Sequence, residues 1–148
     1  MGFRLKRKNS NGEESKDKSK QAKQESNDDK EIASLIEDAK NKILQNQLSE
    51  ALHDLGKVLV VRPNNIDALV QRGEIYRRQR KLEDALIDLN KALAISPDDY
   101  PALCARGDVY REQGKFEDAL VDLNKVVTMA IAATKGHALL VRGELYQQ

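Results

Sequence analysis

The sequence predicts an all-α solenoid, a rod built from stacked pairs of antiparallel helices. The first observation is an internal repeat: RGEIY at residues 72–76 returns as RGDVY at 106–110 and as RGELY at 142–146, after steps of 34 and 36 residues. The second is that each unit carries two apolar stripes with helical spacing, separated by a short polar break. Units of this kind pack on their neighbours and present an extended surface to a partner. Binding is therefore the expected function.

Residues 1–30 are expected to form a disordered, charged tail. They carry nine Lys or Arg against six Asp or Glu, and Ala22 is the only apolar residue from Asn9 to Asp29. Such a segment buries too little apolar surface to offset the entropy of ordering it. The basic cluster at residues 3–8 fits a solvated tail best, and a nuclear-import patch or a contact with an anionic surface less well.

The first unit is expected at residues 31–65, with apolar stripes that run from Ile32 to Ile43 and from Leu48 to Leu59. It is degenerate, because Lys42 stands where the later units place a Tyr. We therefore expect its first helix to pack less tightly and to act as a capping element.

The second and third units are expected at residues 66–99 and 100–135, with the breaks between their helices at residues 80–81 and 114–115. The residues expected to hold the helices together are Gly73, Tyr76, Ala85 and Pro97 in the second unit, Gly107, Tyr110 and Ala119 in the third, and Gly143 beyond it. A glycine that faces an alanine lets two helices approach closely, and a larger side chain would overpack the contact.

The third unit lacks the proline that ends the earlier ones. We expect its second helix to run on through Ala130 and Ile131 and to turn at residues 134–136. Residues 136–148 then supply the first helix of a partial fourth unit, whose apolar face is only half covered.

Together these marks resemble the tetratricopeptide repeat family, whose units carry a small residue and a Tyr on the first helix, Ala twice on the second, and Pro at the exit. The resemblance covers about residues 32–148. It implies a right-handed superhelix of three repeats plus one helix, with a concave wall made mainly by the first helices. The protein-binding residues that it implies are Val70, Gln71, Glu74, Arg77, Arg78, Cys104, Asp108, Arg111, Glu112, His137, Val141 and Glu144.

Charged residues also recur with the period of the repeat. Arg72, Arg106 and Arg142 occupy a slot on the first helix that the family usually fills with an apolar residue, and Asp54, Asp88 and Asp122 recur on the second helix. We hypothesise that each Arg pairs with an Asp of an adjoining second helix, within its own unit or in the one before it.

One known function of the family is chaperone binding, in which Lys, Asn and Arg side chains clamp a terminal carboxylate. At the corresponding positions this chain has Ile36, Lys40, Gln71, Pro101 and Ala105. A frame shifted by one unit places Val70, Glu74, Ala105, His137 and Val141 there and fits no better. We therefore expect no carboxylate clamp.

Composition and spacing exclude most chemical functions. His53, Cys104 and His137 are scattered too widely for a metal site, and no catalytic set or phosphate-binding glycine loop appears. Cys104 is expected to be a small, half-buried helix residue. No apolar run reaches the roughly 20 residues of a membrane helix. We expect no enzyme, no cofactor and no metal, nucleic-acid binding is not indicated, and the expected location is the cytoplasm or nucleus.

The sequence thus predicts a non-catalytic adaptor or scaffold that binds a peptide or helix of another, unidentified protein through the concave surface. The alternative is an assembly or regulatory segment that self-associates, or docks on a larger subunit, through the uncovered C-terminal helix.

Overall fold

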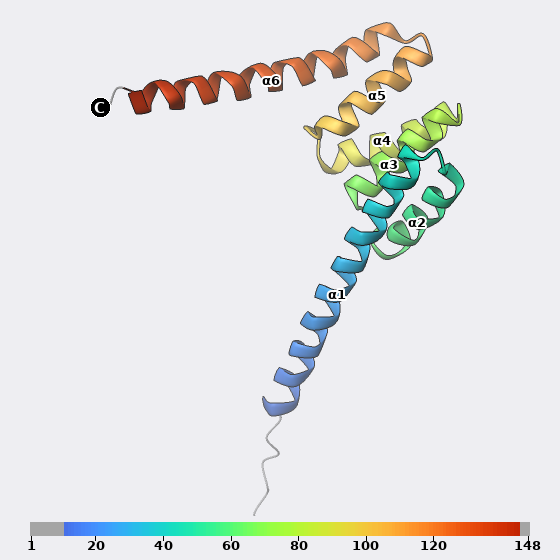
Figure 1. Ribbon diagram of the computed structural model, residues 1–148, viewed down its shortest axis with the longest axis vertical. Coiled ribbons are helices and arrows are strands. Elements are labelled where there is room, and N and C mark those ends of the chain that lie inside the picture. Colours follow the sequence, from blue (N-terminus) through green and yellow to red (C-terminus); the bar gives the residue numbers. More distant parts are fainter. Residues whose placement is uncertain (1–10, 146–148) are drawn as a thin grey trace, which may run out of the picture.

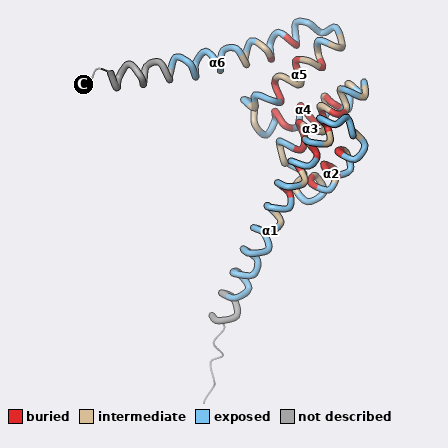
Figure 2. The backbone as a smooth tube through the Cα atoms, viewed as in Figure 1, coloured by how far each residue is buried: buried red, intermediate tan, exposed pale blue. Residues whose placement is uncertain are grey.

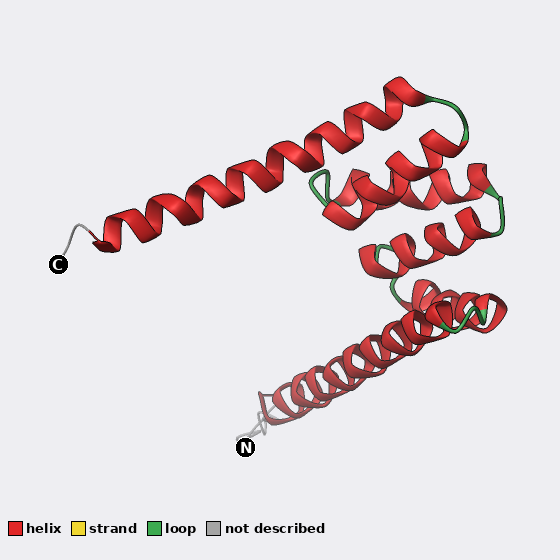
Figure 3. Ribbon diagram, turned by 45° about the horizontal axis from the view of Figure 1, so that its top comes forward, coloured by secondary structure: helices red, strands yellow, loops and turns green. Residues whose placement is uncertain are grey.

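The computed structural model describes the backbone of residues 11–145 and the side chains of residues 16–135. This part of the chain consists of helices joined by short turns (Figure 3). The helices are α1 (Asn11–Leu44), α2 (Leu48–Val61), α3 (Ile66–Arg78), α4 (Leu82–Ile95), α5 (Tyr100–Glu112) and α6 (Phe116–Leu145). None of them, over the described residues, is long and apolar enough to cross a membrane.

Consecutive helices pack as antiparallel hairpins, α1 with α2, α3 with α4 and α5 with α6 (Figure 1). Each hairpin rests on the next through the contacts of α2 with α3 and of α4 with α5, and α3 also contacts α1 and α5. Within the described residues every packed pair joins helices that are one or two places apart along the chain. The predicted all-α solenoid is confirmed.

The turn inside each hairpin recurs every 34 residues. Asn46, Arg80 and Gly114 have positive φ angles of 61°, 63° and 74°, which places them in the left-handed region. In the second hairpin the Lys81 N–H closes the turn by donating to the Tyr76 carbonyl at 2.9 Å. This arrangement satisfies the last carbonyls of a helix and reverses the chain. Both breaks predicted from the sequence lie at these turns.

The connections between hairpins also repeat. The side chain of Asn65 accepts a hydrogen bond from the Ala68 N–H at 2.9 Å, and that of Asp99 accepts one from the Ala102 N–H at 3.0 Å. Each satisfies an N–H group that the first turn of a helix leaves unpaired. Pro97 lies in the loop before Asp99, where it prevents α4 from continuing.

The helices of a hairpin meet closely at glycine. A Cβ atom on Gly73 would lie 2.9 Å from Leu89 Cγ, and one on Gly107 would lie 3.1 Å from Leu123 Cγ. The opposing alanines are buried: Ala85 is fully buried and Ala119 is 4% exposed. The predicted close approach at the two glycines is confirmed. The buried residues follow the packed hairpins (Figure 2).

A bidentate ion pair joins the helices of each of the two later hairpins. The Nε and Nη2 atoms of Arg72 donate to the two Asp88 oxygens at 2.6 and 2.8 Å. The same two atoms of Arg106 donate to the two Asp122 oxygens, each at 2.7 Å. Both Asp side chains are only 4% exposed. The predicted pairing within one unit is therefore confirmed for these two; the Arg142 side chain lies outside the described residues.

Each arginine also lies over the tyrosine that follows it on the same helix. The guanidinium carbon of Arg72 is 5.9 Å from the centre of the Tyr76 ring, and that of Arg106 is 5.8 Å from the centre of Tyr110. This spacing gives a cation–π attraction that holds the guanidinium over the interface.

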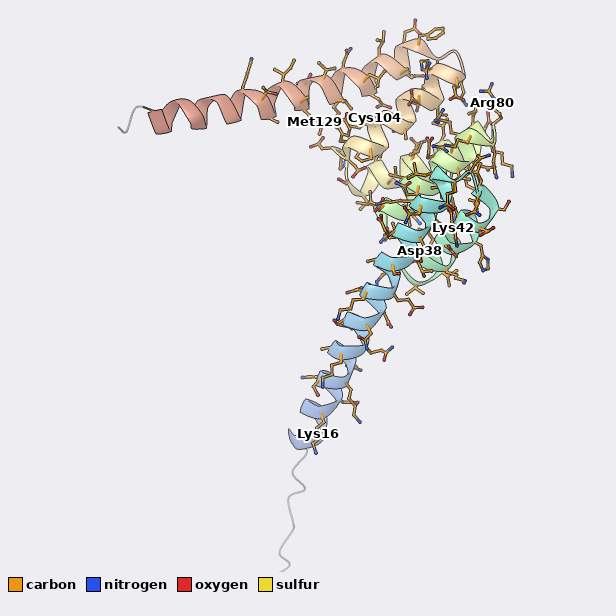
Figure 4. The ribbon with its side chains drawn as sticks, in the orientation of Figure 1. Lys16, Asp38, Lys42, Arg80, Cys104 and Met129 are labelled. Atoms are coloured by element: carbon orange, nitrogen blue, oxygen red, sulfur yellow. The ribbon has the colours of Figure 1, made fainter. Side chains whose placement is uncertain are left out.

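The first hairpin builds its ion pair differently. Asp38 occupies the slot that holds Arg72 one unit later, so the buried Asp54 has no arginine there. Lys42, one turn further along α1 (Figure 4), donates to Asp54 instead. The hydrogen bond to Asp54 raises the pKa of Lys42 against the opposing effect of burial. Lys42 thus replaces the expected Tyr and also supplies the missing cation.

The N-terminal segment differs from the prediction. Residues 11–30 belong to α1 instead of forming a disordered tail, whereas the first ten residues lie outside the described part. In residues 11–30 the Lys, Glu, Gln and Ala residues have high helix propensity. The Gln24 amide also donates a hydrogen bond to Asp28, one turn further along the helix, at 3.0 Å. The segment is exposed, and the core begins at Ile32.

The C-terminal segment differs as well, because α6 has no turn at residues 134–136. It continues to Leu145, and the Thr134 hydroxyl donates to the Ala130 carbonyl at 2.8 Å. The run from Met129 to Ala133 favours helix, and no proline interrupts it. The backbone of residues 136–145 therefore extends the second helix of the third unit instead of starting a separate one.

We expect Gly73→Val to lower the free energy of unfolding by about 1–3 kcal/mol, because the new side chain must displace Leu89 from a dense contact. Urea unfolding followed by circular dichroism measures the change. Gly56→Ala is the matched control: no atom lies within 4 Å of its new Cβ, so this variant should gain about 0.5–1 kcal/mol from helix propensity. Equal effects of the two variants would contradict the close approach.

Arg106→Ala should lower the free energy of unfolding by about 3 kcal/mol, because it leaves the buried Asp122 carboxylate without its cation. Replacing Arg106 and Asp122 together by Leu should cost less than the single change. Arg111→Ala breaks an exposed pair with Asp108 and should cost less than about 1 kcal/mol. Similar losses for Arg106→Ala and Arg111→Ala would contradict the structural role of the buried pair.

Candidate functional site

Three first helices, α1, α3 and α5, lie next to one another along one side of the stack. Most of the residues expected to bind a partner fall on α3 and α5. We call seven of them the inner face: Gln71, Glu74, Arg77, Arg78, Asp108, Arg111 and Glu112. His137, Val141 and Glu144 lie outside the described side chains.

An ion-pair network occupies the end of the inner face where α3 and α5 terminate. Arg77 donates to both carboxylate oxygens of Glu74, at 2.7 and 2.9 Å, and also to Glu112 on α5. Arg80 donates to the second oxygen of Glu112 at 3.0 Å, and Arg78 donates to Glu74 at 3.0 Å. Three guanidinium groups thus share two carboxylates, and the network joins α3 to α5.

A second set of contacts joins α1 to α3. The ammonium group of Lys40 lies 2.7 Å from an Asp67 oxygen, and the Arg78 guanidinium donates to the backbone carbonyl of Ile43 at 3.2 Å. The Ile43 carbonyl, in the last turn of α1, also accepts a hydrogen bond from the Asn46 N–H at 3.1 Å, so the guanidinium adds a second donor at this helix end. Polar contacts thus run across all three first helices.

The Glu74 carboxylate is the most perturbed acid on the inner face. Partial burial is the largest single effect and raises its pKa, but the hydrogen bonds and positive charges of Arg77 and Arg78 together outweigh it, so the pKa lies below its ordinary value of 4.5. The same contacts raise the pKa of Arg77, with the Glu74 hydrogen bond as the largest cause. Glu74 therefore stays ionised at neutral pH and holds two arginines in place.

The inner face offers one ion pair that remains largely in solvent. On α5 the Nη2 atom of Arg111 lies 3.1 Å from the Oδ1 atom of Asp108, which precedes it by three residues. The Asp108 side chain is 44% exposed and the Arg111 side chain is 61% exposed. Such a pair contributes little to stability and is accessible to a partner. Arg111 is therefore the predicted binding residue whose substitution perturbs the fold least.

Two of the predicted binding residues on α3 and α5, Val70 and Cys104, are not part of the inner face. Val70 is only 5% exposed and belongs to the core shared by α3, α4 and α5, so it is a packing residue and not a contact residue. It belongs to the same buried cluster as Leu69 and Leu103, which lies between α3 and its neighbours. Cys104 on α5 is half-buried and is a free thiol (Figure 4).

Sequence reasoning missed some of the residues that link one first helix to the next. Arg80, Lys40 and the Ile43 carbonyl all take part in these links, although none was expected at the surface that binds a partner. The repeat does not suggest the pairing of Lys40 with Asp67, because the residues 34 positions later are Glu74 and Pro101. The left-handed turn at Arg80 does recur, but its equivalents Asn46 and Gly114 carry no cation, so the repeat does not indicate the contact of Arg80 with Glu112.

The described side chains provide no cluster suited to metal binding. Across residues 16–135 no group of three or more His, Cys, Asp or Glu side chains comes together in a way that could hold an ion. The chemistry of the inner face in this region consists of hydrogen bonding and charge pairing.

Glu74→Gln should reduce the dependence of stability on pH below about pH 5. The folded pKa of Glu74 is depressed, so its contribution is fully present above the ordinary value of 4.5 and is lost as pH falls through the lower folded value. Wild type should therefore lose more stability than the variant between about pH 7 and about pH 3 in thermal unfolding. Glu37→Gln on α1 controls for the loss of an exposed carboxylate; identical pH profiles for Glu74→Gln and wild type would contradict the network.

Residues 64–132 match the family model of the tetratricopeptide repeat. No curated protein matches the chain at a significant level. Among solved structures, the first TPR of Spaghetti (RPAP3), bound to the HSP90 peptide SRMEEVD, is 25% identical with a TM-score of 0.63, and the alignment covers 67% of this chain and 79% of that chain.

Two further structures agree. The first TPR domain of human RPAP3 is 26% identical with a TM-score of 0.62 and coverage of 66% and 76%. A tetratricopeptide repeat protein from Parabacteroides merdae is 30% identical with a TM-score of 0.59, and the alignment covers 68% of this chain and 40% of that one. The repeated hairpins, the small residues at their contacts and these matches lead to one conclusion: residues 64–132 of this chain belong to the tetratricopeptide repeat family.

Proposed function

We propose that this protein is a non-catalytic adaptor whose inner face binds a peptide or helix of another protein. The observation that carries the proposal is the alignment of α1, α3 and α5, whose polar side chains are fixed by contacts between neighbouring helices. A surface held in this way loses little conformational entropy on binding. The peptide bound by the first TPR of RPAP3, a protein of similar fold, supports the same kind of function.

The charges of the inner face favour a partner that carries both signs. Arg77 and Arg78 already contact Glu74, and Glu112 already contacts two arginines, so a strongly acidic or strongly basic partner would have to separate these pairs. A partner with alternating charges can add to the network without breaking it. Binding should therefore weaken with salt, since the Asp108–Arg111 pair is exposed.

The proposed partner differs from the HSP90 peptide in the related structures. That peptide, SRMEEVD, is acidic at its C-terminal end, whereas the clamp positions expected from the family hold Ile36, Lys40, Gln71, Pro101 and Ala105 in this chain. Ile36 is buried in the core, and the ammonium group of Lys40 is paired with Asp67. These contacts argue against a clamp for a terminal carboxylate.

Arg111→Glu should weaken peptide binding by about tenfold, because it reverses the most exposed cation of the inner face. The measurement starts from a phage-displayed library of random peptides: sequences enriched on the wild-type protein are synthesised and titrated by fluorescence polarisation. Lys91→Glu is the matched control, since it reverses an exposed cation on α4, the second helix of its hairpin.

Circular dichroism establishes that both variants remain folded. If Arg111→Glu bound the selected peptides as wild type does, while Lys91→Glu lost affinity, the partner surface would lie on the second helices and the proposal would be wrong.

A further inference from the structure

The second helix of the last hairpin has an exposed apolar face. On α6, Phe116, Leu120 and Val127 are 59%, 56% and 54% exposed. We call these three residues the end face. Together they form a stripe with helical spacing at the end of the stack of hairpins.

The same positions are covered in the two earlier hairpins. The equivalent side chains, 34 and 68 residues earlier, are all half-buried or buried: Leu82, Leu86 and Leu93 on α4, and Leu48, Leu52 and Leu59 on α2. Leu93, the counterpart of Val127, is only 7% exposed. The cover is in each case the first helix of the next unit, α5 over α4 and α3 over α2. The end face is therefore shaped for one more first helix.

The covering helices use a common pair of residues. Ala68 and Ile75 of α3 belong to the core that contains α2, and Ala102 and Val109 of α5 belong to the core that contains α4. All four are completely buried. In the sequence the pair recurs once more as Ala138 and Leu145, in register with the third RG motif at residues 142–146. Residues 137–148 thus carry the pattern of a helix that covers such a face.

This segment cannot reach the end face of its own chain while α6 is continuous. α6 runs unbroken from Phe116 to Leu145 and projects beyond α5 (Figure 1). The residues of one straight helix cannot fold back on an earlier part of the same helix. The loops that reverse the chain after α2 and α4 contain Pro63 and Pro97, and α6 has no proline at the corresponding place.

We propose that the end face binds residues 137–148 of a second copy of this chain, so that two chains exchange these segments in a symmetric dimer. Each chain delivers its segment along the continuous α6, and the contact forms twice in the dimer. The Ala138 and Leu145 pair then packs with Leu120 and its neighbours as Ala102 and Val109 share one core with Leu86 one unit earlier. This surface is separate from the inner face.

Sedimentation velocity on the full chain tests the exchange. Wild type should be a dimer, and both Leu120→Lys and Leu145→Lys should weaken dimerisation by at least about tenfold, because each places a charge in the same apolar contact. Val121→Lys is the matched control: Val121 is 68% exposed, and its counterpart Ile87 is 66% exposed even in a covered unit. It should dimerise as wild type does, and circular dichroism checks that every variant is folded.

A mixing experiment separates exchange from other forms of self-association. Leu120→Lys retains a normal segment and Leu145→Lys retains a normal end face, so a mixture of the two should form a heterodimer although each alone is a monomer. A heterodimer of this kind supports the proposal. A monomeric wild type, a Leu145→Lys variant that dimerises normally, or a mixture that stays monomeric would overturn it.

Discussion

The close contact between the two helices of each hairpin determines the remaining geometry. At Gly73 and Gly107 a Cβ atom would lie only 2.9 and 3.1 Å from the leucine of the opposing helix, so that leucine would have to shift. When the two helices approach this closely, a side chain on the first helix can reach a side chain sixteen residues later on the second helix. Arg72 reaches Asp88 in this way, and Arg106 reaches Asp122. A bidentate pair with a buried carboxylate tolerates little separation, so glycine and ion pair depend on each other.

The first hairpin meets the same constraint with different residues. Ala39 takes the glycine position and is completely buried, so a methyl group is accepted there. Lys42 reaches Asp54 from one turn beyond the usual arginine slot. The ion pair therefore survives an exchange of residue type and position, which indicates that the fold requires a cation opposite this aspartate and not an arginine in particular.

The sequence contained most of the fold because local rules agree with the packing. The turns, the small residues and the Arg–Asp pairs were predictable since each repeats with the period of the helix pair. Residues 11–30 were not, because low apolar content argues against a core but not against an exposed helix. The turn at 134–136 was expected from the repeat, yet helix propensity without a proline outweighs that pattern. Among the predicted binding residues, Val70 was expected at the surface, and only its packing against neighbouring helices reveals that it is buried.

Every packed pair among the described helices joins elements that are close in the chain, and this has a consequence for motion. A molecule with one cooperative core opens all at once, whereas a stack of hairpins can lose an outer member while the remainder keeps its contacts. The middle hairpin has neighbours on both sides and the outer two have one each. Amide protons of α3 and α4 are therefore expected to exchange with solvent last, and local opening begins at the two ends of the array.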